Sequence, residues 1–389
     1  MYESKTFVYH GPGVVRCETR NIEGGPEDVI VKIRASARCG TDKTIFYKGH
    51  YKVNPPAVLG HEVSAEIVQI GPKVKDLKNG IGYREGEKIS FDLKVGDRVT
   101  VQSRIARYEN GLMLLSDPIT ILSFIIPGGY SQYMKIPKEL ILSGSVVKIP
   151  ESVSDENAAL AEPAACALES IFATPHPVGV DREGRHIYRS GIKKGGNACV
   201  IGSGTVSMIY ALLCRLEEAK NIFIIVRSES KAETVRKIMG GGFKIIVVGD
   251  YGKKPMEEKL REEEKIVGRL KDETGGYLFD DVIPACPSSD AQRLMLKLYT
   301  LQGYAVGACF GGTHELVDGA DIDQNHYRSA KTVGTSGCST RAMETIVRWL
   351  GEGKISFKGF SNPKHFTFAD KPEEFFTAEG LKPLLYPWE

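Results

Sequence analysis

Residues 197–228, which read NACVIGSGTVSMIYALLCRLEEAKNIFIIVRS, constrain the fold of this chain more than any other stretch. An apolar strand runs into a glycine-containing turn, then a helical segment, then a second apolar strand. Strands and helices continue to alternate as far as GYAVGACFGG, at 303–312. This alternation predicts an α/β domain with a parallel, doubly wound sheet.

The turn itself, GSGTVS at 202–207, stands where a phosphate-binding loop belongs. Gly202 allows a tight turn, and Gly204 lets the backbone approach a pyrophosphate at the helix N-terminus. The segment between strand and helix that would contact the cofactor comprises Gly202, Ser203, Gly204, Thr205 and Val206. The third small position is Ser207 rather than Gly or Ala, which predicts slightly wider spacing between helix and strand.

The end of the second strand indicates which dinucleotide binds. NAD-binding folds place Asp or Glu there to hold the ribose 2′-hydroxyl. Here IFIIV ends at Val226 and runs into Arg227 and Ser228, with Lys231 nearby and no acid. These residues can bind a 2′-phosphate, so we predict NADP in preference to NAD. The alternative is that Arg227 is an ordinary exposed loop residue.

The rest of the chain differs in character. Residues 5–150 read as short strands punctuated by Gly and Pro, whereas 156–172 reads as a helix that Pro163 starts or kinks. Residues 173–195 read as a loop or linker, and the segments beyond the helix at 341–353 return to short β-like pieces. For 389 residues two domains are expected. We place a β-rich domain at 1–172, completed by 340–389, and a nucleotide-binding domain at 173–339.

Composition excludes several classes of function. The net charge is +2, with 51 basic and 49 acidic residues, which gives no reason to expect a nucleic-acid or membrane surface. The eight cysteines include no CxxC pair, and the N-terminus has no signal-peptide pattern. The most apolar stretch, at 112–127, is interrupted by Asp117 and Pro118 and is too short to span a bilayer. A cytoplasmic protein is predicted.

Four residues of the β-rich region and the helix after it have the chemistry of metal ligands. Cys39 lies in RCGTDK, His61 and Glu62 lie in VLGHEV, and Glu162 lies in LAEPAA. Thiolate, imidazole and carboxylate suit a catalytic zinc with an open coordination position. Any one of these residues alone is more often structural, and His61 and Glu62 could simply end a loop before an ordinary strand.

The motifs together resemble those of the zinc-dependent medium-chain alcohol and polyol dehydrogenases: CGTD, GHE, GDRV, GGYSQY, the EP of LAEP and GSGTVS follow in that family's order. The resemblance implies a GroES-like β-barrel, a Rossmann domain, an active site between them and a small alcohol or ketone substrate. It also implies that Cys39, His61 and Glu162 bind zinc, with Glu62 as a fourth or exchangeable ligand. Thr41 would begin a proton relay, and homo-oligomers, dimers or tetramers, are usual in the family.

The sequence departs from the family pattern in one informative place. Many members bind a second, structural zinc through four closely spaced cysteines after GDRV, but residues 99–138 contain no cysteine. We therefore predict one catalytic zinc per chain and no structural zinc. Two rival interpretations remain open: a zinc-free NADPH reductase on the same scaffold, and a nucleotide-binding protein without catalysis.

A narrower resemblance, to the sorbose-1-phosphate reductase-like branch, rests on the long 173–195 segment, FDDVIPAC and HYRSAKTVGTSGCST. It implies a ketose phosphate or a cyclic polyol as substrate. Phosphate recognition needs cations, and Arg104 and Arg107 are the candidates. They could equally be surface residues of a rebuilt loop. His326 and Tyr327 are either active-site cleft residues or ordinary packing.

Overall fold

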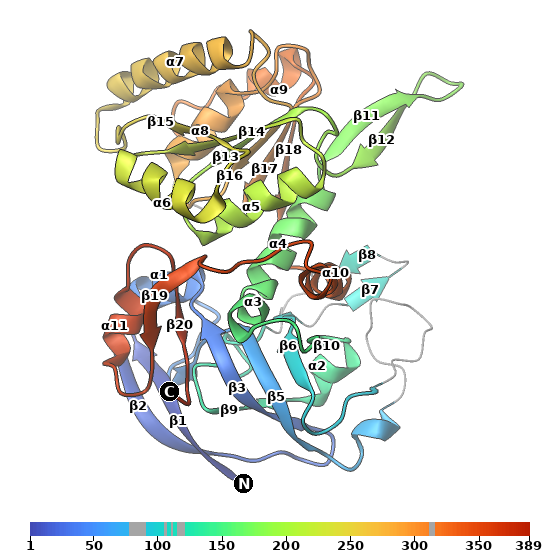
Figure 1. Ribbon diagram of the computed structural model, residues 1–389, viewed down its shortest axis with the longest axis vertical. Helices are drawn as coiled ribbons and strands as arrows, with labels where there is room; N and C mark the ends of the chain where they lie inside the picture. The colour runs from blue at the N-terminus through green and yellow to red at the C-terminus, as the bar shows by residue number, and fades with distance from the viewer. Residues whose placement is uncertain (78–90, 105–106, 110–111, 115–120, 311–315) are drawn as a thin grey trace. The chain divides into compact units, whose positions relative to one another are not determined.

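The computed structural model describes residues 1–77, 91–104, 107–109, 112–114, 121–310 and 316–389 (Figure 1). The chain divides into two compact units. Unit 1 comprises Met1–Cys166 and Gly337–Glu389, and unit 2 comprises Ala167–Ser336. The C-terminal segment therefore returns to the unit in which the chain begins.

Unit 1 is built mainly from antiparallel strands. One described sheet has the order β2-β1-β4, and a larger one has the order β10-β6-β5-β3-β20-β19, with β9 also paired to β3. The apolar residues of β3 and β5 face a common core because side chains alternate across a strand. The strands are β1 (Tyr2–Gly11), β2 (Val14–Ile22), β3 (Val29–Ala37), β4 (Ala57–Val58), β5 (Glu62–Ile70), β6 (Arg98–Val101), β7 (Arg107–Glu109), β8 (Leu112–Leu114), β9 (Tyr133–Ile136), β10 (Val146–Lys148), β19 (Ser361–Phe366) and β20 (Lys382–Leu385).

Short helices connect these strands. The predicted helix at 156–172 is two helices, α3 (Asp155–Ala159) and α4 (Ala161–Phe172), and Pro163 lies in the first turn of α4, where a missing N–H costs nothing. Ser154 caps α3 by accepting from the Asn157 backbone N–H at 3.2 Å. The remaining helical segments are α1 (Gly40–Lys48), η1 (Val74–Asp76), α2 (Lys138–Leu142), α10 (Thr340–Gly351) and α11 (Pro372–Thr377).

Unit 2 contains the predicted doubly wound sheet. Its parallel strands have the order β15-β14-β13-β16-β17-β18, which in chain order is the 3-2-1-4-5-6 arrangement of dinucleotide-binding folds. In Figure 1, α5 and α6 lie on one side of the sheet and α7 and α8 on the other. The elements are β13 (Asn197–Ile201), α5 (Thr205–Leu216), β14 (Asn221–Val226), α6 (Glu229–Met239), β15 (Lys244–Val247), α7 (Met256–Glu273), β16 (Asp281–Pro284), α8 (Ser289–Lys297), β17 (Val306–Phe310), α9 (Asp323–Tyr327) and β18 (Lys331–Thr335).

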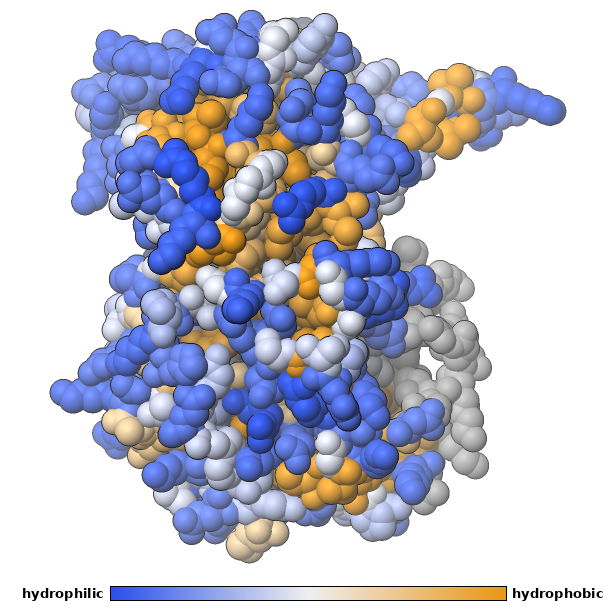
Figure 2. Space-filling view, in the orientation of Figure 1, coloured by the Kyte–Doolittle hydropathy of each residue, from blue (hydrophilic) through white to orange (hydrophobic). Residues whose placement is uncertain are grey.

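The expectation of an irregular loop at 173–195 is wrong. Residues 175–190 form an antiparallel hairpin of β11 (Pro175–Val180) and β12 (His186–Ser190), which projects from the sheet of unit 2 (Figure 1). The Asp181 carboxylate closes its turn by accepting from the backbone N–H groups of Glu183 and Arg185 at 3.0 and 2.8 Å. Figure 2 shows hydrophobic side chains along the hairpin and hydrophilic ones at its tip. Among the described residues, no helix has the length and apolar character needed to cross a membrane.

Candidate metal centre and nucleotide-binding turn

Cys39 is placed by the start of a helix. It is the N-cap of α1, and its Sγ accepts from the Thr41 backbone N–H at 3.5 Å, while its own N–H donates to Asp42 Oδ2 at 3.3 Å. Serine, threonine, asparagine and aspartate are the usual residues at this position. A cysteine at a helix N-terminus instead presents its sulfur where the helix dipole favours the thiolate. The Thr41 side chain is exposed beside it.

His61 and Glu62 lie at the start of β5, and both are buried. The preceding Gly60 has φ +98°, and a Cβ there would lie 2.6 Å from Cδ1 of Tyr130. Glycine is therefore required before the His–Glu pair, since the backbone turns through the left-handed region against an aromatic ring. The glycine of the GHE motif has a structural reason that is independent of any metal.

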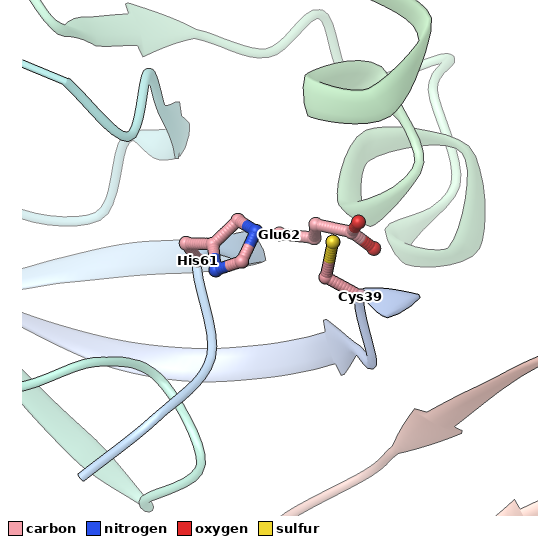
Figure 3. Close-up of side chains that lie close together, drawn as sticks. All are labelled: Cys39, His61 and Glu62. Atoms are coloured by element: carbon pink, nitrogen blue, oxygen red, sulfur yellow. The ribbon is translucent and has the colours of Figure 1, made fainter. Parts of the chain in front are cut away.

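Cys39, His61 and Glu62 come together although they lie on two separate segments. One potential ligand atom from each lies within 4.8 Å of the others, and Figure 3 shows the three side chains directed toward one another. Nδ1 of His61 and Oε2 of Glu62 are buried and have no hydrogen-bond partner among the residues that the structure describes. Buried polar atoms in proteins are nearly always satisfied. A thiolate, an imidazole and a carboxylate with such vacant valences are a donor set that fits zinc.

Asp42 supports the imidazole from behind. This fully buried carboxylate accepts from the Tyr130 hydroxyl at 2.5 Å and from Ser123 Oγ at 3.2 Å, and its Oδ1 lies 3.7 Å from His61 Nδ1. Burial alone would lower the pKa of His61, but the negative charges of Asp42 and Cys39 outweigh it and raise that pKa well above its ordinary value. A carboxylate behind a histidine ring is the arrangement that orients metal-binding imidazoles.

Lys382 completes the surroundings of Glu62, and no feature of the sequence points to this role. Its Nζ lies 2.7 Å from Glu62 Oε1, and both side chains are buried. Burial raises the pKa of Glu62, which Lys382 partly offsets; burial lowers the pKa of Lys382, but Glu62 and Cys39 more than reverse this. A lysine in the short segment LKPLL reads as a surface residue. Only the pairing of β20 with β3 brings it here.

Glu162, the remaining predicted ligand, lies in the first turn of α4 and belongs to a different group of side chains. Its Oε1 accepts from Ser103 Oγ at 2.8 Å and from Cys166 Sγ at 3.5 Å. Possible ligand atoms of Glu162, Cys166 and Cys338 lie within 4.8 Å of one another. The charge of Glu162 nevertheless reaches the first group, because it contributes to raising the pKa values of His61 and Glu62. Sequence reasoning overlooked Cys166, although its spacing of four residues from Glu162 on a helix was visible.

The other candidate residues of the sequence analysis fall in different surroundings. Arg104 is not a surface residue, since only 4% of it is exposed. Arg107 lies in β7, and its side chain is outside the described part of the chain. His326 and Tyr327 lie on α9 and are exposed, their rings packed edge to face at 5.0 Å, so core packing does not account for them.

The glycine turn of unit 2 has the form that the sequence predicts. Gly202 has φ +137°, and a Cβ there would lie 2.4 Å from Ser207 Oγ. Gly204 is the N-cap of α5, so the helix dipole and the first backbone N–H groups, from Thr205 and Val206, face the side where a phosphate would bind. Ser207 is fully buried and donates to the Ala285 carbonyl at 3.3 Å, so the hydroxyl is accommodated by a hydrogen bond.

The residues after β14 gather positive charge at the surface. Ser228 is the N-cap of α6 and accepts from the Lys231 backbone N–H at 3.4 Å. The Arg227 side chain is 76% exposed, and its Nη1 lies 3.7 Å from Oδ1 of Asp250, which is also exposed. An exposed pair at this separation contributes little to stability, so Arg227 remains available to an anionic ligand.

Comparisons with known proteins agree with this geometry. Residues 25–82 match the model of the alcohol dehydrogenase GroES-like domain. L-threonine 3-dehydrogenase of Pyrococcus furiosus is 24% identical over 365 residues, which cover 90% of this chain and 88% of the relative. Sorbitol dehydrogenase of Rattus norvegicus is 26% identical over 251 residues, or 63% and 61% of the two chains. A Sinorhizobium meliloti protein described as a zinc-binding dehydrogenase, solved with NADP bound, shares the fold over all of both chains, with a TM-score of 0.77 and 19% identity.

Proposed function

This chain is an oxidoreductase of the medium-chain alcohol and polyol dehydrogenase family, and on that premise we propose that it is a zinc-dependent, NADP(H)-linked enzyme that interconverts a secondary alcohol and its ketone. The observation that carries the proposal is the buried group of Cys39, His61 and Glu62, in which a carboxylate oxygen of Glu62 has no hydrogen-bond partner in the described part of the chain. A scaffold that had lost its metal would not be expected to retain such a costly vacant atom.

Cys39, His61, Glu62 and Glu162 would hold the metal, and because residues 99–138 contain no cysteine we propose one zinc per chain. A bound zinc supplies Lewis acidity, which lowers the pKa of an alcohol or polarises a carbonyl. The chain's own contribution is placement: α1 presents the sulfur at its N-terminus, and the Asp42 carboxylate lies 3.7 Å from Nδ1 of the imidazole. Lys382 offsets part of the negative charge that the two carboxylates and the thiolate would otherwise accumulate.

Thr41 is proposed to pass the hydroxyl proton toward solvent. Its backbone N–H contacts Cys39 Sγ, and its side chain is exposed, which supports a role at the solvent side of the metal group. We expect Thr41→Ala to reduce turnover about 10²-fold, as is usual for removal of a proton-transfer group, while zinc stays bound. Thr41→Ser should retain most of the activity because it keeps the hydroxyl.

The cofactor is proposed to be NADP, with NAD as the alternative. Gly202, Ser203, Gly204, Thr205 and Val206 would face the pyrophosphate. Arg227, Ser228 and Lys231 would face the 2′-phosphate, and β14 ends without an acid that would repel it. Hydride transfer is the chemistry that the nicotinamide supplies.

The substrate is proposed to be a polyol, a sugar or a sugar phosphate. A phosphorylated substrate is favoured by one observation: Arg104 is buried next to Ser103, the residue that donates to Glu162. Its guanidinium carbon lies 3.4 Å from where a Cβ on Gly337 would stand, one residue before Cys338. A guanidinium is suited to a bidentate contact with phosphate, so Arg104 is the residue proposed to recognise it.

The experiment is NADPH oxidation by zinc-loaded protein across matched free and phosphorylated ketoses, with NADH as the parallel cofactor. Turnover of the phosphorylated members alone would support phosphate recognition, whereas turnover of free ketoses or cyclic ketones alone would remove it and leave the dehydrogenase standing. Activity that survives complete zinc removal would point to a zinc-free reductase. Nucleotide binding without any turnover would point to a non-catalytic protein.

A further inference from the structure

A second group of metal-binding side chains lies in the interior of unit 1. Glu162 and Cys166 stand one helical turn apart on α4, and Cys338 comes directly before Ser339, the N-cap of α10. Their exposed fractions are 5%, 8% and 0%, and possible ligand atoms of the three lie within 4.8 Å of one another. Neither cysteine is in a disulfide.

The backbone around this group is fixed from one short segment. Ser103 Oγ donates to Glu162 Oε1 at 2.8 Å, and Gln102 Nε2 donates to the Cys338 carbonyl at 2.5 Å. Gln102 Oε1 in turn accepts from the Arg104 backbone N–H at 3.0 Å. The two halves of the group, which are far apart in the sequence, are therefore held by adjacent residues, and such outer hydrogen bonds are what orient metal ligands.

We propose that Cys166, Cys338 and Glu162 form a second binding position for a thiophilic divalent ion, such as Cd²⁺ or excess Zn²⁺, distinct from the position at Cys39, His61 and Glu62. Two thiolates and a carboxylate are a soft, anionic donor set that selects these ions over Mg²⁺ or Ca²⁺. Two buried cysteines alone would be ordinary core residues. The buried carboxylate of Glu162 beside them distinguishes this group from a purely apolar packing site.

A redox pair is the less suitable interpretation of the same residues. Both thiols are buried, with 8% of Cys166 and none of Cys338 exposed, so oxidants have little access to them. Oxidants attack the thiolate, so a buried thiol of this kind reacts slowly. A divalent ion instead displaces the thiol protons as it binds.

Occupation of this position would affect catalysis through Glu162. If the proposed function is correct, Glu162 is also a ligand of the catalytic zinc, so an ion held by Cys166 and Cys338 would draw its carboxylate away. We expect the second ion to inhibit turnover, and this consequence alone rests on the proposed function. The binding itself does not depend on it.

The test is a Cd²⁺ titration followed by the ultraviolet thiolate-to-cadmium charge-transfer absorbance, in the full-length Cys39→Ser protein. This variant removes the only thiolate of the first group, so remaining absorbance must come from other cysteines. We expect absorbance that saturates with about two thiolates per bound ion. It should be lost in Cys39→Ser/Cys338→Ser and in Cys39→Ser/Cys166→Ser, and kept in Cys39→Ser/Cys17→Ser, because Cys17 is exposed on β2.

Absence of saturable absorbance in Cys39→Ser would overturn the proposal, as would a signal that Cys338→Ser leaves unchanged. Circular dichroism of each variant separates lost binding from lost folding. For a variant that fails to fold, cadmium X-ray absorption of Cys39→Ser alone decides, since two sulfur ligands per ion are expected and one or none contradicts the site. Cadmium binding here with no zinc-dependent turnover would refute the proposed function and leave this site intact.

Discussion

Two groups of buried charges, one in each unit, differ in how completely they are satisfied. In unit 2, the fully buried Glu263 accepts from Arg293 Nε at 2.9 Å and Nη2 at 2.6 Å, and Lys297 Nζ lies 2.9 Å from it. Arg293 also donates to the Asp318 carbonyl at 3.1 Å and to Asp290 at 2.7 Å. Glu263, Arg293 and Asp290 each have at least two charged partners, as structural buried ion pairs require.

The group in unit 1 lacks this completeness. Glu62 uses one oxygen to pair with Lys382, whereas its other oxygen and Nδ1 of His61 are buried and form no hydrogen bond within the described ranges of the chain. Leaving such atoms unpaired costs on the order of 1–3 kcal/mol each. The difference indicates that the charges of unit 2 serve the fold, whereas those of unit 1 are arranged for a ligand that the chain alone does not supply.

The largest effect is expected from a substitution that removes one ligand from the group of Cys39, His61 and Glu62. Cys39→Ser should reduce zinc content from about one per chain to near zero and cut kcat/KM by more than about 10²-fold, since losing even an outer partner of a metal ligand commonly costs 10–100-fold. Elemental analysis and steady-state kinetics measure both. The melting temperature should change little, and Cys17→Ser is the matched control. Full activity without bound zinc would contradict the assignment.

The next largest effect is expected from a substitution in the buried ion-pair network of unit 2. Glu263→Gln leaves Arg293 and Lys297 short of their counter-charge, so the free energy of unfolding should fall by about 3–5 kcal/mol. Denaturant titration measures this loss, while zinc content should stay unchanged. Adding Arg293→Met should recover part of the stability, because the unpaired guanidinium is then removed. A single variant as stable as the parent would mean that the network contributes no stability.

The fold was predictable where the signal is local. The strand–turn–helix alternation of unit 2 lies within short windows of sequence, and the parallel sheet followed from it. The hairpin at 175–190 was not predicted because Pro175, Pro177 and Gly179 are typical of loops. It tolerates them because it is only two strands wide, so each strand has an edge at which a missing N–H breaks no ladder.

The proximity of the candidate ligands was predictable to the extent that they stand in recognisable motifs, as Cys39 and His61 do. Lys382 and Cys338 carry no local mark, because each reaches its group only when the C-terminal segment folds back onto unit 1. The pairing of Glu162 with Cys166 and Cys338 likewise depends on where α10 begins. Partner choice among buried side chains is a tertiary property, and spacing alone does not determine it.

A smaller effect is expected from removing the exposed charge of Arg227, which is proposed to bind the cofactor. Arg227→Ala should raise KM for NADPH about 10-fold, which corresponds to about 1.4 kcal/mol, and leave KM for NADH nearly unchanged. Stability should not change, because the Arg227–Asp250 pair is exposed at 3.7 Å. Arg182→Ala, on the exposed tip of the hairpin, is the matched control. Equal changes with both cofactors would show that Arg227 does not distinguish them.

The smallest effect concerns Glu217, a half-buried carboxylate that follows α5. Burial raises its pKa, and Arg189 offsets this only in part. When the pKa of a carboxylate is higher in the folded than in the unfolded state, the group does not lower the free energy of unfolding below about pH 4. Its destabilising effect develops as the pH rises through the folded-state pKa. Glu217→Gln should therefore stabilise the protein at pH 7 by about 0.5 kcal/mol, after allowance for solvent screening. The gain should vanish at acidic pH.

Denaturant titrations of parent and Glu217→Gln between pH 4 and pH 8 measure that difference, and zinc content and kcat serve as controls that should not move. The result bears on the two buried groups as well. Suppose that the partly offset charge of Glu217 lowers the free energy of unfolding even though this residue is only half-buried. The fully buried atoms of His61 and Glu62 that lack hydrogen bonds must then lower it more, and a bound ion is the natural reason to keep them. If the variant matches the parent at every pH, incomplete compensation is tolerated in this protein, and the contrast between its two buried groups loses its energetic basis.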